Sequence, residues 1–253
     1  MLPHFTFHGK ISDMRRRFFV EKFENQRAMM EGEAAHHLGR VLRAQPGQLY
    51  ELSDGMQVWL GRVETVTRDA VDFALLEELP AVHPVIETTL LLAVVKFDSF
   101  EWALEKATEL GVKAIVPLTA ARSEKALLTA APKRAERWKK LLLEAAQQSR
   151  RVEVPRLLPL AKPEAAFRSA SAGLRIFFSE LPDAPPLQKV LPGRKESLVT
   201  LAIGPEGGWT DAELAHARAA GFQDASLGKL ILRAETAVIA GLANLAFALG
   251  SDV

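Results

Sequence analysis

Two glycine-bearing loops near the carboxyl end of the sequence have residue types and spacing suited to binding a small molecule. The first, GPEGG at 204–208, directly follows the apolar run LVTLAI and precedes Thr210 and Glu213. The T-x-x-E spacing predicts a capping box that starts a helix. A strand, a glycine turn and a capped helix surround a ligand at the carboxyl end of a sheet. A tight structural turn is the alternative explanation of these glycines.

The second loop, LGKLILRAETA at 227–237, joins a short apolar run to the last predicted helix. The loop is largely apolar and carries Arg233 and Glu235 near its end. Apolar walls with free backbone groups suit an adenine ring. The alternative is a local ion pair of Arg233 and Glu235, with Thr236 as the helix N-cap.

Several classes of site are excluded by what the chain lacks. Trp209 follows Gly208 where a P-loop needs Lys-Ser/Thr, and no G-x-G-x-x-G motif is present, so ATP and NAD are not the predicted ligands. The chain has no cysteine, which excludes disulfides, thiol nucleophiles and cysteine-ligated metals. The six histidines have no metal-binding spacing, and we predict no metal site.

The elements that position these loops fall into two stretches. The first reads as mostly β, with a hairpin signal at Asp54-Gly55 and a short helix at 33–43. Its predicted strands are 48–54, 56–66 and 70–79. Short strands at this spacing predict a small barrel, and the proline-bearing residues 80–87 are the predicted linker.

From Thr88 onward, apolar runs alternate with helices, which predicts βα units around a parallel sheet covered on both faces. The predicted strands are 88–95, 114–120, 174–178, 198–203 and 225–227. The predicted helices are one capped by Asp98 or Ser99 and ended by Gly111, a long one at 132–150, and a last one at 236–249. The last helix is apolar nearly all round, so we expect a second subunit to cover one side of it. A central helix of a monomer core is the alternative.

Charge is distributed unevenly along a chain of net charge +1. Residues 122–156 contain ten Lys/Arg and four acids, a net +6, and Arg15-Arg16-Arg17 is a second cluster. Such patches hold a phosphate backbone, although a solvated helix face is the alternative. The longest apolar stretch, 237–249, is too short to span a bilayer and no secretory signal is visible, so we predict a cytoplasmic protein without membrane contact.

The paired loops GPEGGWTDAE and LGKLILRAETA resemble the RsmE family of 16S rRNA uridine-N3 methyltransferases of the SPOUT superfamily. The same family is resembled by KATELGV (106–112), EAAQQSRR (144–151), RRFFV (16–20) and HHLGRVLRAQPGQ (36–48). The resemblance therefore covers about residues 15–250, and we assign no role to residues 1–14.

The resemblance implies a PUA-like RNA-binding β-barrel at 15–80, followed by an α/β SPOUT methyltransferase domain at 81–253 with a C-terminal trefoil knot. It also implies a homodimer that binds S-adenosyl-L-methionine between the two late loops, with a third wall near Ser179 and Glu180. The predicted cofactor-binding residues are Ser179, Ile203, Gly204, Pro205, Glu206, Gly207, Gly208, Leu227, Gly228, Ile231, Leu232, Arg233 and Thr236.

Methylation of uracil N3 requires a group that accepts the N3 proton and a group that stabilises charge on O2 and O4. Glu206 or Glu235 is a candidate base, and the sequence does not choose between them. Arg233 or Arg17 is the candidate for charge stabilisation, because arginine stays protonated. The predicted catalytic residues are Arg17, Arg233 and Glu235.

The implied partner is 16S rRNA or the small ribosomal subunit. The predicted RNA-binding residues are Arg15, Arg16, Arg17, Arg40, Arg43, Arg150 and Arg151. Two other functions fit less well. A SPOUT enzyme that methylates a ribose 2′-hydroxyl is disfavoured by the RRFFV and HHLGRVLR segments, and a non-catalytic RNA-binding protein is disfavoured by the apolar late loop.

Overall fold

The computed structural model of the chain describes residues 16–250 and consists of two compact units. Unit 1 comprises the described residues up to Val82 together with Ala146–Glu153. Unit 2 comprises His83–Ala145 and the described residues from Val154 onward. The grouping of the short segment 146–153 with the amino-terminal residues was not predicted from the sequence.

Unit 1 is built on one six-stranded sheet with the order β1-β4-β5-β6-β3-β2. Among the described residues this sheet is an open half-barrel. Its strands are β1 (Arg17–Phe19), β2 (Phe23–Glu24), β3 (Arg27–Glu31), β4 (Leu49–Ser53), β5 (Val58–Val66) and β6 (Ala70–Leu79). The inward side chains form one core that includes Phe18, Leu52 and Phe73.

The three strands expected between 48 and 79 are present as β4, β5 and β6. The helix expected at 33–43 is shorter, because α1 (Gly32–His36) passes into a π-helical turn at His37–Val41. Strands β1, β2 and β3 were not predicted. Strands β1 and β2 have only three and two residues, which are too few to show the alternation that identifies a strand, and β3 has five.

Unit 2 contains a second six-stranded sheet with the order β12-β10-β11-β7-β8-β9, and every pairing in it is parallel. Its strands are β7 (Glu87–Ala93), β8 (Ala114–Leu118), β9 (Arg156–Leu157), β10 (Leu174–Phe178), β11 (Leu198–Ile203) and β12 (Gln223–Ala225). Its helices are α2 (Phe97–Glu109), α3 (Lys125–Ala130), α4 (Ala135–Gln148), α5 (Pro163–Arg168), α6 (Leu187–Val190), α7 (Asp211–Ala219) and α8 (Ala234–Leu249), and the end of α4, from Ala146 onward, belongs to unit 1.

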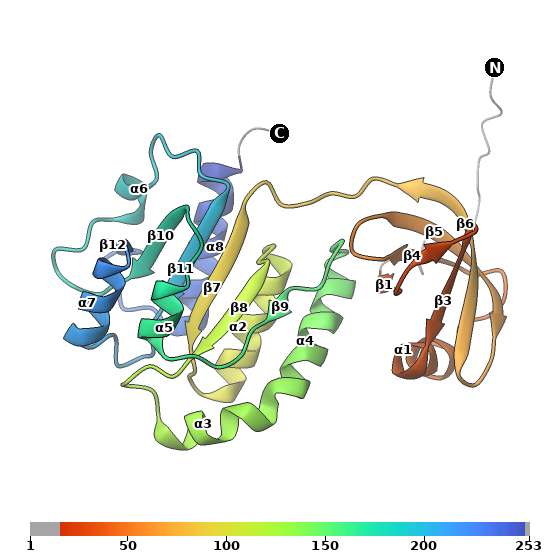
Figure 1. Cartoon of the computed structure of the whole chain (residues 1–253), viewed down its shortest axis with the longest axis horizontal. Helices are drawn as coiled ribbons and strands as arrows, with labels where there is room; N and C mark the ends of the chain where they lie inside the picture. The colour runs from red at the N-terminus through yellow and green to blue at the C-terminus, as the bar shows by residue number, and fades with distance from the viewer. Residues whose placement is uncertain (1–15, 251–253) are drawn as a thin grey trace. The chain divides into compact units, whose positions relative to one another are not determined.

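Helices cover both faces of this parallel sheet, as its apolar strands require (Figure 1). Leu90 and Leu92 of β7 face a core shared with α2, α4 and α8. Leu91 and Ala93, which alternate with them, face a core shared with α5 and α7. The two-sided burial explains why the strands read as continuous apolar runs in the sequence.

Two helix starts differ from their prediction. The helix after β7 begins at Phe97 behind Lys96, with no side-chain cap, so Asp98 and Ser99 lie in its first turn, and the Ser99 hydroxyl donates to Glu235. The last helix begins at Ala234 rather than Thr236, since Arg233 takes the extended N-cap conformation. Gly111 ends α2 with φ +87°, as predicted.

The burial expected around the last helix is only partly present in a single chain. Leu242 and Leu245 of α8 are buried in the core, and Gly241 packs against Phe178. Ala243 and Phe247 are exposed on the opposite side. No helix in the described part of the chain is both long and apolar enough to cross a membrane.

Candidate functional site

A cavity of about 640 Å³ lies at the carboxyl ends of β10, β11 and β12 in unit 2. Residues that follow each of these three strands line it. Parallel neighbours end at the same edge of a sheet, so three loops distant in sequence converge there. The volume falls within the range of sites for small ligands and cofactors.

The cavity brings together most of the residues predicted to bind a cofactor. Those that line it are Ser179, Ile203, Gly204, Pro205, Glu206, Gly207, Gly208, Leu227, Gly228, Ile231 and Leu232. Arg233 and Thr236 do not line it, although Ala234 and Ala237 beside them do. Leu230 and Ile231 are 82% and 79% exposed, so the second loop presents apolar side chains to solvent.

The GPEGG loop is held in place by the residues that follow it. Thr210 and Glu213 form the predicted capping box at the start of α7. The Trp209 indole donates from Nε1 to the carbonyl oxygen of Phe178 at 2.9 Å, which ties the loop to the end of β10. This structural role of Trp209 was not predicted, since in the sequence the residue only rules out a P-loop.

The three glycines of the GPEGG loop are required for different reasons. Gly208 has φ +69°, a conformation that favours glycine. A Cβ on Gly204 would meet the Trp209 ring at 3.0 Å. A Cβ on Gly207 would meet the Arg122 side chain at 3.2 Å. The loop backbone therefore packs closely against the side chains of Trp209 and Arg122.

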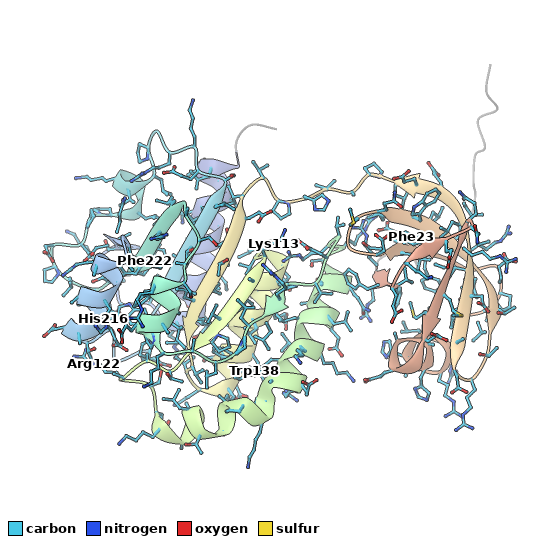
Figure 2. The ribbon with its side chains drawn as sticks, viewed as in Figure 1. Phe23, Lys113, Arg122, Trp138, His216 and Phe222 are labelled. Carbon is cyan, nitrogen blue, oxygen red and sulfur yellow. The ribbon has the colours of Figure 1, made fainter. Side chains whose placement is uncertain are left out.

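Arg122 lines the same cavity from a fourth segment, the loop after β8. Its guanidinium donates from Nη1 to the carbonyl oxygen of Gly207 at 2.8 Å. Figure 2 labels this side chain at the periphery of unit 2. In the sequence Arg122 is one cation of the basic segment, and its role here was not predicted because a contact across 85 residues leaves no local signal.

The two catalytic candidates of the second loop have different surroundings. Arg233 is exposed, and its side chain has no hydrogen bond or ion pair with the described residues. Glu235 is 4% exposed and does not line the cavity. Its Oε1 accepts a hydrogen bond from the Ser99 hydroxyl at 3.2 Å, while its Oε2 is buried without a partner in the described part of the chain. The local Arg233–Glu235 ion pair does not form.

Arg17, the third catalytic candidate, lies in unit 1 and is 6% exposed. It stands directly opposite Glu51 in the pairing of β1 with β4, and its Nη2 lies 3.0 Å from Glu51 Oε2. Arg150 binds the same carboxylate, with its Nε 3.1 Å from Oε2 and its Nη2 against Oε1. Glu51 is fully buried, so two predicted RNA-binding arginines enclose a buried carboxylate.

The other predicted RNA-binding arginines differ in exposure. Arg16, Arg40 and Arg43 are exposed on unit 1, and Arg43 has φ +55°. Arg151 is buried, which lowers its pKa, while the charge of Glu153 acts in the opposite direction. Arg15 lies outside the described residues.

Part of the basic segment 122–156 is used within the fold. Arg134 and Arg137 of unit 2 both bind Glu101 of α2, a carboxylate that is 6% exposed. Burial raises the pKa of Glu101, but the hydrogen bonds and charges of the two arginines outweigh it and lower the pKa overall. Across residues 16–250, no group of three or more His, Asp or Glu could hold a metal ion.

Comparison with known proteins gives two matching family models. An RNA methyltransferase domain matches residues 82–246, and an RNA methyltransferase PUA domain matches residues 31–76. The chain is 36% identical over 222 residues to ribosomal RNA small subunit methyltransferase E of Synechocystis, covering 83% of this chain and 69% of the relative. It is 30% identical over 263 residues to the Bacillus subtilis protein of the same name, covering 91% and 96%.

A solved structure resembles the whole fold. Ribosomal RNA small subunit methyltransferase E from Neisseria gonorrhoeae, bound to S-adenosyl methionine, superposes with a TM-score of 0.83 at 29% identity. The similarity covers 92% of this chain and 98% of that protein. The predicted combination of a PUA domain with an α/β methyltransferase domain is thereby confirmed.

Proposed function

Because the chain belongs to the RsmE family of small-subunit ribosomal RNA methyltransferases, we propose that it methylates N3 of a uridine in 16S rRNA with S-adenosylmethionine as donor. The observation that carries the proposal is the single cavity formed by the two late loops and the end of β10. We place this activity in the cytoplasm, on 16S rRNA or the small ribosomal subunit.

The residues present fit the cofactor. Apolar side chains of Ile203, Leu227 and Leu232 line the cavity, and Gly228, with φ +129°, has open space where a Cβ would stand. When bound, S-adenosylmethionine supplies an electrophilic methyl group on its sulfonium. The protein's contribution is to hold the loops so that the methyl group and the uracil nitrogen are aligned, and positioning of this kind supplies much of the acceleration.

The surroundings of the charged residues favour particular roles. Arg233 is exposed between two cavity-lining residues, so we assign it to stabilising negative charge on the uracil oxygens. Glu206 is exposed and lines the cavity, which makes it the better placed of the two candidate bases. Glu235 is buried, so it could act as the base only if the uracil N3 proton reached its Oε2, which has no hydrogen-bond partner among the described residues.

Among the arginines predicted to bind RNA, we assign this role chiefly to the exposed Arg16, Arg40 and Arg43. Arg150, whose side chain is 52% exposed, contributes as well. Phosphate contacts need accessible cations, which Arg17 and Arg151 are not. Whether Arg17 also contacts the uracil stays a prediction.

Mapping of modified nucleosides tests the reaction. We expect 16S rRNA incubated with the protein and S-adenosylmethionine to gain one methyl group on the base of a uridine, and a free uridine to be a very poor substrate. A methyl group on the ribose would instead support the 2′-hydroxyl reaction. Binding of RNA without binding of S-adenosylmethionine in calorimetry would support the non-catalytic protein.

The finer features of the fold belong to the same proposal. A trefoil knot would bring both late loops to one cavity, and their convergence there supports it. A homodimer would cover the side of α8 that carries Ala243 and Phe247, of which Phe247 is 83% exposed. Burial of such an apolar stripe drives association.

If the protein is a homodimer through α8, charged substitutions at two nearby positions of this helix should have different effects. Phe247→Asp places a charge on the exposed side of α8, so we expect a folded monomer. Leu245→Asp places a charge at a position that is fully buried within the chain, so we expect loss of the fold. Light scattering and thermal unfolding distinguish the two. A wild-type monomer at micromolar concentration, or a Phe247→Asp dimer, would contradict the proposal.

A further inference from the structure

Arg122 connects the loop after β8 to the GPEGG loop by both packing and hydrogen bonding. The three atoms closest to a Cβ on Gly207 all belong to the Arg122 side chain, at 3.2–3.8 Å. The Nη1 of the same side chain donates to the Gly207 carbonyl at 2.8 Å. The aliphatic stem therefore contacts one side of the glycine while the guanidinium binds its oxygen.

The segment that carries Arg122 is itself fixed. The Ala121 amide donates to Glu213 Oε1 at 2.8 Å, and the Ser123 amide donates to the Ala120 carbonyl at 3.0 Å. Glu213 is also the capping-box residue of α7, and its Oε2 accepts from the Thr210 amide at 2.8 Å. One buried carboxylate thus anchors the Arg122 segment on one side and the end of the GPEGG loop on the other.

We propose that Arg122 is a positioning residue, which holds the GPEGG loop in the conformation that binds the cofactor. Trp209 ties one side of this loop to β10, and Arg122 ties the other side to the loop after β8. Without Arg122, the loop gains conformations in which Gly207 and Gly208 leave the cavity wall, and cofactor binding must then select the competent one. This inference rests on the proposed function, since it assumes that the cavity binds S-adenosylmethionine.

Calorimetric titration with S-adenosylmethionine tests the role directly. We expect Arg122→Ala to weaken binding by about five- to tenfold. This is the scale of one exposed charge-assisted hydrogen bond that also orders the GPEGG loop. Arg122→Lys keeps a donor and part of the stem, so it should recover part of the affinity. The control is Arg168→Ala, which removes an exposed arginine of α5 whose ion-pair partner among the described residues is Glu164 on its own helix, and this variant should bind as wild type does.

A double-mutant cycle of Arg122→Ala and Gly207→Ala distinguishes a positioning role of Arg122 from two independent losses of affinity. The new Cβ would press on Arg122 and displace the Gly207 carbonyl from the guanidinium, so this substitution should weaken binding by a similar factor. In the Arg122→Ala background that hydrogen bond is already gone, although the Cβ of residue 122 remains 3.2 Å from the new methyl group, so the same change should cost less there than in the wild-type protein. Fully multiplicative effects would overturn the proposal.

Kinetics give a second criterion. A positioning role raises the KM for S-adenosylmethionine while kcat at saturating cofactor stays within about twofold of wild type. A loss confined to kcat would instead make Arg122 part of the reacting centre and would overturn the inference. Wild-type protein that does not bind S-adenosylmethionine would contradict the proposed function. Wild-type binding with an unchanged Arg122→Ala variant would contradict this inference alone.

Discussion

Replacement of Arg233 by alanine is expected to lower kcat for RNA methylation by about 10²–10³, the effect of removing one donor that stabilises charge in a transition state. Arg233 is the N-cap residue of α8 and lies between the cavity-lining residues Leu232 and Ala234. Its guanidinium has no partner among residues 16–250, so its donors are available to the uracil oxygens. The loss should therefore appear in the chemical step.

Single-turnover rates at saturating RNA and S-adenosylmethionine measure this effect without a contribution from binding. Arg233→Lys should recover only part of the rate, because one ammonium cannot reproduce the planar donor pair of a guanidinium. Lys189→Ala, which removes an exposed cation from α6 outside the cavity lining, serves as the control. An Arg233→Ala enzyme with the wild-type single-turnover rate would remove Arg233 from the mechanism.

The second large effect concerns stability. Glu51→Ala should lower the free energy of unfolding of unit 1 by about 3–5 kcal/mol, because removal of one partner from a buried ion pair leaves the other charge uncompensated. Glu51 is fully buried, and Arg17 beside it is 6% exposed. Arg150→Ala should cost less, since its side chain is 52% exposed and can be hydrated.

Hydrogen exchange of the full-length protein in increasing denaturant measures the stability of β1 and β4 separately from that of unit 2. Glu64→Ala is the matched control, since Glu64 pairs with Arg62 at an exposed position of the same unit and should cost less than about 1 kcal/mol. Equal protection of the Glu51→Ala and Glu64→Ala proteins would show that the buried pair contributes nothing.

The contribution of the Arg17–Glu51 pair to stability complicates the interpretation of methylation rates measured on Arg17 variants. A slow Arg17→Ala enzyme would be expected from disruption of unit 1 alone, because Glu51 would lose its cross-strand partner. Replacement of both Arg17 and Glu51 by apolar residues of similar volume removes the two buried charges together and is the better test, since the remaining partner, Arg150, is 52% exposed and can be hydrated. Methylation that survives the double replacement would leave Arg17 as a structural residue.

Local signals in the sequence were sufficient for several parts of the molecule. Continuous apolar runs indicated the buried strands β7, β10 and β11, because a strand covered on both faces has no polar side. The T-x-x-E spacing indicated the capping box of α7, since its two hydrogen bonds join residues three positions apart. The two late loops identified most of the cavity wall, and their resemblance to a known family indicated the cofactor and the reaction.

Only the tertiary structure decided how distant residues combine. The Arg122–Gly207 contact spans 85 residues and the Arg150–Glu51 pair spans 99, and no periodicity or spacing in a single sequence encodes such pairs. The same limit applied to burial. Arg233, the N-cap of α8, is exposed, whereas Glu235, two residues later in the first turn of that helix, is buried and binds Ser99. The sequence by itself determined which residue types were available and which elements would form. Packing of those elements determined which charges are buried in the fold and which remain accessible to cofactor and RNA.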